Sequence, residues 1–136
     1  MAASVLVDAG FLIALLSRRD AHHPWAAAQG ANFPPPWSTC EAVLSEAFHV
    51  VGARGAPALG ALLRRRSLHL AFDLSDQLEP ALKLMEKYSD VPMSLADACL
   101  VRMTEVLSDS LILTTDKDFH VYRRHSRHVI PCLVPE

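Results

Sequence analysis

The sequence lacks long apolar runs and has few cysteines. No run approaches the roughly 20 apolar residues that a membrane-spanning helix needs. The cysteines, Cys40, Cys99 and Cys132, are odd in number and show no C-x-x-C spacing, which is typical of free thiols in a reducing compartment. The N-terminus shows neither a basic leader nor a clear cleavage site, so we expect a cytoplasmic protein without a signal peptide.

The sequence also lacks an excess of charge of either sign. Its 13 Lys and Arg residues and 15 Asp and Glu residues give a formal net charge of −2. This balance excludes a strongly basic surface over the whole protein, but clustered carboxylates would mask local basic patches, so a nucleic-acid partner stays open. The 136 residues are 51% hydrophobic and 21% charged, which predicts one folded domain over residues 1–136.

Strand and helix patterns alternate along the chain. The predicted strands cover residues 4–7, 67–72, 111–114 and 129–134, and the predicted helices cover residues 11–16, 20–29, 38–51, 56–66, 76–88, 93–105 and 119–124. The first strand is a short apolar run without alternation, which is typical of a strand buried on both faces. The alternation predicts an α/β fold with a mostly parallel sheet and right-handed crossovers.

The proline-rich segment 33–37 is expected to be a stiff connection, because its prolines exclude a helix or a central strand. Ser38, followed by Glu41 three residues later, fits a capping box and predicts a helix that begins at Ser38. Glu41 therefore has a structural explanation. Glu46 lies a turn further along among small and apolar neighbours, where capping does not explain a carboxylate.

Four acidic residues stand where this fold would bring them to one edge of the sheet. Asp8 and Asp116 directly follow predicted strands, Asp97 is near the start of a helix, and Glu46 lies inside another helix. Ligands of open α/β sheets bind at the carboxyl ends of the strands. A structural interpretation competes at two positions, because Asp8 alone fits a helix N-cap and Asp97 fits a capping box with Ser94.

Four carboxylates in one pocket would repel one another and raise one another's pKa unless a cation neutralised them. Oxygen-only ligands favour Mg²⁺ or Mn²⁺, which leave positions free for water and for a substrate phosphate. The sequence has no Walker-type loop, no G-x-S-x-G motif and no Rossmann fingerprint. Metal-assisted hydrolysis of a phosphodiester is therefore the chemistry that this pattern favours.

Four motifs resemble those of PIN domains: VLVDAG at residues 5–10, AVLSE at 42–46, MSLADA at 93–98 and LTTDKDF at 113–119. Their order and spacing, and the length of the chain, resemble the VapC-like ribonuclease toxins of bacterial toxin–antitoxin pairs. The resemblance implies a three-layer α/β/α fold and an endoribonuclease that depends on Mg²⁺ or Mn²⁺. It also implies a homodimer, and inhibition by a cognate antitoxin whose segment fills the active-site groove.

The resemblance assigns roles residue by residue. The acidic ligands of the family match Asp8, Glu46, Asp97 and Asp116. Asp118 matches a more variable acid that assists them, and Thr115 matches a small hydroxyl residue that orients a ligand or water. Gly10 departs from the family, because many members have Ser or Asn at this position. Whether Glu46 binds the ion or positions the attacking water stays open.

Two arginine clusters are candidates for contact with the RNA backbone, because guanidinium groups match phosphate oxygens. They comprise Arg64, Arg65 and Arg66, and then Arg123, Arg124 and Arg127. Each cluster also has a competing structural explanation. The first would stabilise the negative C-terminal end of a helix dipole, and the second would form a basic face in contact with solvent.

Three other functions fit the same residues. In a non-catalytic PIN-like module, the acids would serve only as caps, and the domain would bind RNA or protein. The same acids could instead serve another Mg²⁺-dependent phosphoesterase, such as a small phosphatase or a DNA nuclease. A housekeeping ribonuclease would share the chemistry of a toxin without its antitoxin.

Overall fold

The structure, a computed structural model, describes residues 4–136 and has a five-stranded parallel sheet at its centre. The strand order is β3-β2-β1-β4-β7. The strands are β1 (Ser4–Val7), β2 (Trp37–Thr39), β3 (Leu68–Leu70), β4 (Ser110–Leu113) and β7 (Cys132–Leu133). The predicted α/β class with a mostly parallel sheet is therefore confirmed.

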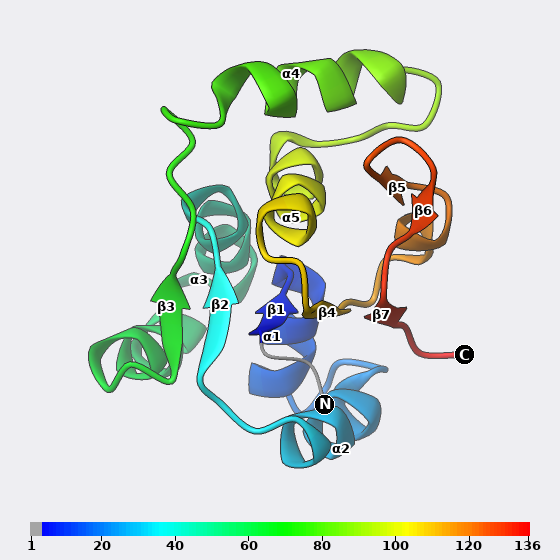
Figure 1. Ribbon diagram of the computed structural model, residues 1–136. Coiled ribbons are helices and arrows are strands. Elements are labelled where there is room, and N and C mark those ends of the chain that lie inside the picture. Colours follow the sequence, from blue (N-terminus) through cyan, green and yellow to red (C-terminus); the bar gives the residue numbers. More distant parts are fainter. Residues whose placement is uncertain (1–3) are drawn as a thin grey trace.

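Helices cover both faces of this sheet (Figure 1). They are α1 (Ala9–Leu16), α2 (His23–Asn32), α3 (Glu41–Arg64), α4 (Leu78–Lys87) and α5 (Leu95–Val106). In Figure 1, α4, α5, β1, α1 and α2 follow one another from top to bottom, as expected for a three-layer α/β/α fold. The chain after β4 forms a short 3₁₀ helix, η1 (Lys117–His120), and an antiparallel ribbon of β5 (Arg123–Arg124) and β6 (His128–Val129).

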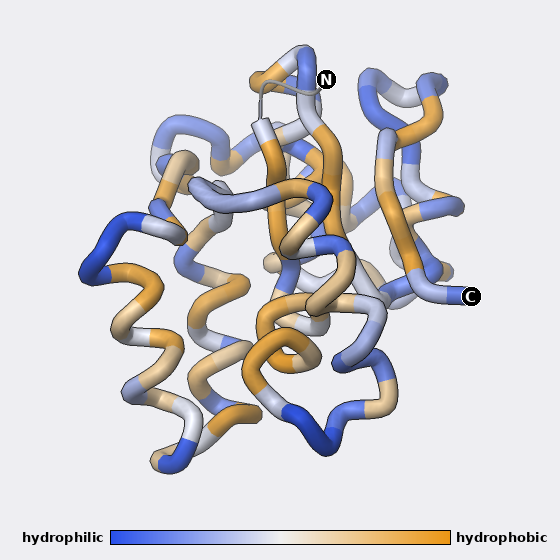
Figure 2. The backbone as a smooth tube through the Cα atoms, turned by 90° about the horizontal axis from the view of Figure 1, so that it is seen from below, coloured by the Kyte–Doolittle hydropathy of each residue, from blue (hydrophilic) through white to orange (hydrophobic). Residues whose placement is uncertain are grey.

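The core lies around the central strands, because β1 and β4 are apolar on both faces. Leu6, Val7, Ile112 and Leu113 are fully buried. Figure 2 shows the apolar segments running through the middle of the molecule, with the most hydrophilic segments on peripheral loops. Within residues 4–136, none of the helices has the length and apolar character needed to span a membrane.

The predicted helix start at Ser38 is wrong, because Ser38 lies inside β2 between β1 and β3. The Thr39 hydroxyl donates to the Val7 carbonyl at 2.9 Å, which ties this three-residue strand to its neighbour. The N-cap of α3 is Cys40, whose side chain makes no capping hydrogen bond. Gly52, with a φ of 63°, interrupts α3 near the predicted break between two helices.

The predicted helix over residues 119–124 is also wrong beyond His120. Arg123 and Arg124 instead pair with Val129 and His128 in the β5–β6 ribbon. The turn between these strands uses positive φ angles at His125 and Ser126, so a helix cannot continue through it.

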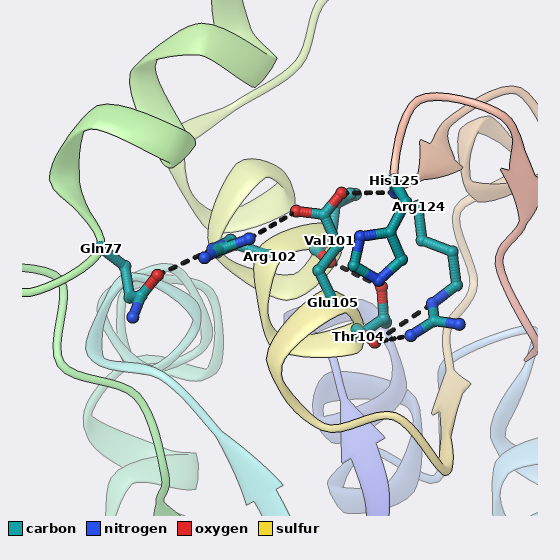
Figure 3. Close-up of polar contacts among 7 residues, drawn as sticks. All are labelled: Gln77, Val101, Arg102, Thr104, Glu105, Arg124 and His125. Atoms are coloured by element: carbon teal, nitrogen blue, oxygen red, sulfur yellow. Dashed lines mark hydrogen bonds and ion pairs between the residues drawn. The ribbon is translucent and has the colours of Figure 1, made fainter.

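The ribbon and the start of α4 hold α5 between them (Figure 3). The Arg102 guanidinium donates to the Gln77 side chain at 2.7 Å and to the Glu105 carboxylate at 3.1 Å. On the other side, the backbone N–H of His125 donates to Glu105 at 2.6 Å, and the Arg124 guanidinium donates twice to the Thr104 carbonyl. These contacts fix the C-terminal half of α5, whose N-terminal half carries Asp97.

We predict that Arg124→Ala lowers the free energy of unfolding by about 1–2 kcal/mol, because it removes two hydrogen bonds from a charged donor to the last turn of α5. Chemical denaturation would measure the change. Arg127→Ala is the matched control, since Arg127 lies exposed in the same ribbon turn and should leave stability unchanged. Equal effects of the two substitutions would contradict this role for Arg124.

Candidate functional site

A pocket of about 190 Å³ opens at the carboxyl ends of β1 and β4. The strand order reverses between these two strands, so the pocket lies at the point where open α/β sheets bind their ligands. Its lining residues are Asp8, Ala9, Gly10, Val43, Glu46, Ala96, Asp97, Leu100, Thr115 and Asp116. All four acids that the sequence analysis singled out therefore share one cavity.

Asp8 is the most buried of these acids, with 7% of its surface exposed. It caps α1, because its Oδ1 accepts a hydrogen bond from the backbone N–H of Phe11 at 2.8 Å. Burial raises the pKa of Asp8 to about 7, against the effect of its hydrogen bonds, and the charges of Asp116 and Asp97 raise it further. The predicted capping role is present, and it coexists with a place in the pocket.

Thr114 connects two of the acids through one hydroxyl group. Its Oγ1 donates a hydrogen bond to Oδ2 of Asp8 and accepts one from the backbone N–H of Asp116 at 2.9 Å. The side chain is fully buried at the end of β4. Sequence reasoning missed this residue, although a β-branched hydroxyl residue directly before Thr115 and Asp116 was a usable signal.

Asp97 belongs to a complete capping box at the start of α5. Its backbone N–H donates to the Ser94 hydroxyl at 3.0 Å, and its Oδ2 accepts from the Ser94 N–H at 3.1 Å. The phenol of Tyr122 lies 3.4 Å from the same Oδ2. Partial burial raises the pKa of Asp97, the hydrogen bonds from Ser94 lower it, and the charge of Asp116 raises it.

Tyr122 was missed by the sequence analysis, and no local pattern marks it. Its side chain is buried against Phe119 and Tyr88, with edge-to-face ring contacts of 5.3 and 5.1 Å between centroids. Burial and the surrounding carboxylates raise the pKa of its phenol, so the hydroxyl keeps its proton and can act as a donor to Asp97.

Glu46 and Asp116 complete the acidic lining from opposite sides. Glu46 comes from α3, where its side chain is exposed, and partial burial together with the charge of Asp97 raises its pKa. Asp116 caps η1, with its Oδ1 accepting from the backbone N–H of Asp118 at 2.9 Å. Asp118 itself is not among the residues that line the pocket.

Gly10 allows the Thr115 hydroxyl to lie against α1. A Cβ atom at position 10 would overlap Oγ1 of Thr115 and come within 3.5 Å of Oδ1 of Asp8. Thr115 thus brings its hydroxyl to the space that a side chain at position 10 would occupy. Gly10 departs from the family pattern, and the Thr115 hydroxyl takes the place of the side chain that Gly10 lacks.

The donor set fits a hard divalent cation. Carboxylates from four separate segments face one cavity, and the pKa values of Asp8, Asp97 and Glu46 are raised by burial and by neighbouring carboxylates. A cation would relieve both effects. Among residues 4–136, no three His, Cys, Asp or Glu side chains are gathered around one point at metal-binding distances.

The predicted RNA-contacting arginines lie outside this pocket. Arg64, Arg65 and Arg66 are exposed at the end of α3. Arg123 donates to main-chain carbonyls of residues 120–122, and Arg124 donates to Thr104 as described above. Both side chains therefore have structural roles, and contact with RNA stays a prediction for each cluster.

Comparison with known proteins identified the family of the chain and similar solved structures. The model of the PIN domain family matches residues 5–124. The crystal structure of Mycobacterium tuberculosis VapC20, described as a sarcin–ricin loop cleaving toxin, is similar with a TM-score of 0.79 and 25% sequence identity, covering 94% of this chain and 100% of that chain. No curated protein matches the sequence.

We predict that the metal-free protein loses stability as the pH rises from about 4 to 7. Over this range the folded protein retains the Asp8 proton that the unfolded chain releases, since the pKa of Asp8 is near 7 in the fold. Asp8→Asn should flatten this dependence by an amount on the order of a few kcal/mol. Thermal unfolding in EDTA between pH 4.5 and 8 would measure the stability of both proteins. The same pH dependence in wild type and Asp8→Asn would refute the raised pKa of Asp8.

We also predict energetic coupling between Gly10 and Thr115. Gly10→Ala should destabilise the protein because its Cβ overlaps the Thr115 hydroxyl. In a Thr115→Ala background the same change should cost clearly less, because the overlapping hydroxyl is gone and only a contact of 3.3 Å with Cβ of residue 115 is left. The preference of helices for Ala over Gly, about 1 kcal/mol, acts in the same direction. A double-mutant cycle from urea unfolding should give a coupling of about 1 kcal/mol or more, whereas additive effects would contradict the contact.

Proposed function

This chain belongs to the PIN-domain family and is VapC-like, and on that premise we propose that it is a divalent-metal-dependent endoribonuclease that acts as a toxin. One observation carries the proposal: Asp8, Glu46, Asp97 and Asp116 come from four different segments and line one pocket. If these acids served only as helix caps, they would not need to line the same pocket. Glu46 in particular serves no cap, and it still lines the pocket close enough to Asp97 for the charge of Asp97 to raise its pKa.

Asp8, Asp97 and Asp116 would hold a Mg²⁺ or Mn²⁺ ion, because carboxylate oxygens are the ligands that these ions prefer. The bound ion would activate water and stabilise negative charge on the phosphate oxygens. Asp118 lies near Asp116 without lining the pocket, so we propose only an indirect role for it, through the η1 cap.

Other residues of the site would orient the ligands of the ion, and Glu46 would accept a proton. The Thr114 hydroxyl holds Oδ2 of Asp8, and Ser94 and Tyr122 hold Oδ2 of Asp97, which leaves Oδ1 of Asp97 available. Glu46 has a raised pKa and an exposed carboxylate. We assign it the role of general base, since a pKa closer to neutrality makes its Oε atoms better acceptors for a proton of the attacking water.

RNA is the substrate that we propose, supported by the similarity to VapC20, whose structure is described as that of a sarcin–ricin loop cleaving toxin. A cytoplasmic location would follow from that substrate. By the same reasoning, we propose a cognate antitoxin that covers the pocket and a homodimeric protein. A non-catalytic binding module and a housekeeping nuclease remain the competing functions, which the experiments below distinguish from a toxin.

Glu46→Gln and Asp97→Asn are each predicted to reduce Mg²⁺-dependent cleavage of single-stranded RNA by about 100-fold or more. Gln cannot accept a proton from the attacking water, and a neutral Asn is a weaker ligand for the ion than a carboxylate. Gel-based cleavage assays with RNA, DNA and a phosphomonoester would measure rate and substrate class. Glu41→Gln is the matched control, since Glu41 lies on the same helix outside this pocket and should be fully active. Unchanged cleavage by both active-site variants would favour a binding module.

Mg²⁺ is predicted to raise the melting temperature at pH 8 and to have much less effect at pH 5. At the lower pH, a proton on Asp8 competes with the ion, because its pKa is near 7. Thermal unfolding with millimolar MgCl₂ would show the difference, and Asp8→Asn should abolish it. A Mg²⁺ effect that is equal at both pH values would contradict binding at Asp8.

To separate a toxin from a housekeeping nuclease, the wild-type protein and Asp97→Asn would be expressed in bacteria. A toxin should arrest growth, and the variant should not. Co-expression of the reading frame next to the gene should restore growth if it encodes the antitoxin.

A further inference from the structure

Two cysteines lie side by side in a second cavity. Cys40 stands at the junction of β2 and α3, and Cys99 lies in the middle of α5. Both are buried, with 2% and 1% of their surfaces exposed. They line a cavity of about 80 Å³ together with residues of the segment that follows β3, Phe72 and Leu74. No residue of this cavity belongs to the acidic pocket.

The two thiols line the same cavity and lie close enough for each to affect the ionisation of the other. The Cys99 thiol lowers the pKa of Cys40, against the opposing effect of burial. The backbone N–H groups of Val43 and Ala42 act in the same direction at the start of α3, although no capping hydrogen bond of ordinary geometry forms. Thiols at helix N-termini are typically more reactive than free cysteine.

We propose that Cys40 and Cys99 are a redox pair, which hydrogen peroxide converts into a disulfide bond across the junction of α3 and α5. The cavity that both cysteines line has a volume of about 80 Å³, which is room enough for a molecule as small as hydrogen peroxide. This site lies apart from the acidic pocket and goes beyond the proposed function.

The reaction balances in two steps. The Cys40 thiolate attacks one peroxide oxygen, which breaks the O–O bond and gives a sulfenic acid at Cys40 and one water after protonation. The Cys99 sulfur then attacks the Cys40 sulfur, and the hydroxyl group leaves with the Cys99 proton as a second water. Two thiols are oxidised and one peroxide is reduced. A dithiol reductant reverses the reaction.

The disulfide would reach the acidic pocket through the two helices that it joins. Cys40 precedes Glu46 on α3, and Cys99 follows Asp97 by two residues on α5. A disulfide holds its two Cα atoms about 4.4–6.8 Å apart, so its formation would fix the spacing between the start of α3 and α5. Small displacements of reacting groups lower rates strongly. This consequence rests on the proposed nuclease function, whereas the disulfide itself does not.

The first test follows the bond itself in the full chain with Cys132→Ser, which removes the third thiol. Peroxide treatment, followed by alkylation and mass spectrometry, should show the loss of two hydrogen atoms and a linked peptide pair containing Cys40 and Cys99. Two alkylated thiols, or sulfinic acid at either position, would overturn the proposal. Cys40→Ser should fold well, because Ser is a favoured N-cap, and it should form no link.

The second test measures RNA cleavage before and after oxidation. Cleavage should fall about tenfold or more on oxidation and recover with dithiothreitol, while Cys40→Ser should keep its activity throughout. A linked protein with undiminished cleavage would overturn the coupling between the two sites. A protein that forms the link but never cleaves RNA would instead refute the proposed function, since the mass measurement has already established the disulfide.

Discussion

The register between β1 and β4 is the constraint on which the acidic pocket depends. Val7 pairs with Leu113, so the next residues along the two strands, Asp8 and Thr114, emerge at the same level of the sheet. Only in this register can the Thr114 hydroxyl reach the Asp8 carboxylate while it also accepts from the N–H of Asp116. A slip by one residue would turn Asp8 to the opposite face and separate all three groups.

This register has an electrostatic cost that the surrounding core must offset. It buries the Asp8 carboxylate beside two other acids, which raises its pKa and destabilises the metal-free fold above neutral pH. The apolar strands on both sides, with Leu6 and Ile112 fully buried, supply the stability that makes such a site tolerable. A cation in the pocket would offset this buried negative charge, which is the role that we propose for Mg²⁺ or Mn²⁺.

The sequence predicted most of this pocket because three of its acids occupy positions with a local signature. Asp8 and Asp116 follow strands, and Asp97 fits a capping box, while Glu46 stood out because no such explanation applied. Thr114 and Tyr122 were missed because their roles come from contacts across 106 and 25 residues of chain. β2 was missed because three residues between two partner strands are too short to show a periodic pattern.

Helix α5 is the element through which the separate features act on one another. It carries Asp97 in its first turn and Cys99 two residues later, and the Arg102 and Glu105 contacts fix its far end. Most of its residues are buried, although Leu95 and Val106 near its ends are exposed. A packed helix moves as a unit, because close-packed interiors transmit displacement instead of absorbing it. A bond at Cys99 therefore cannot shift α5 without also shifting Asp97.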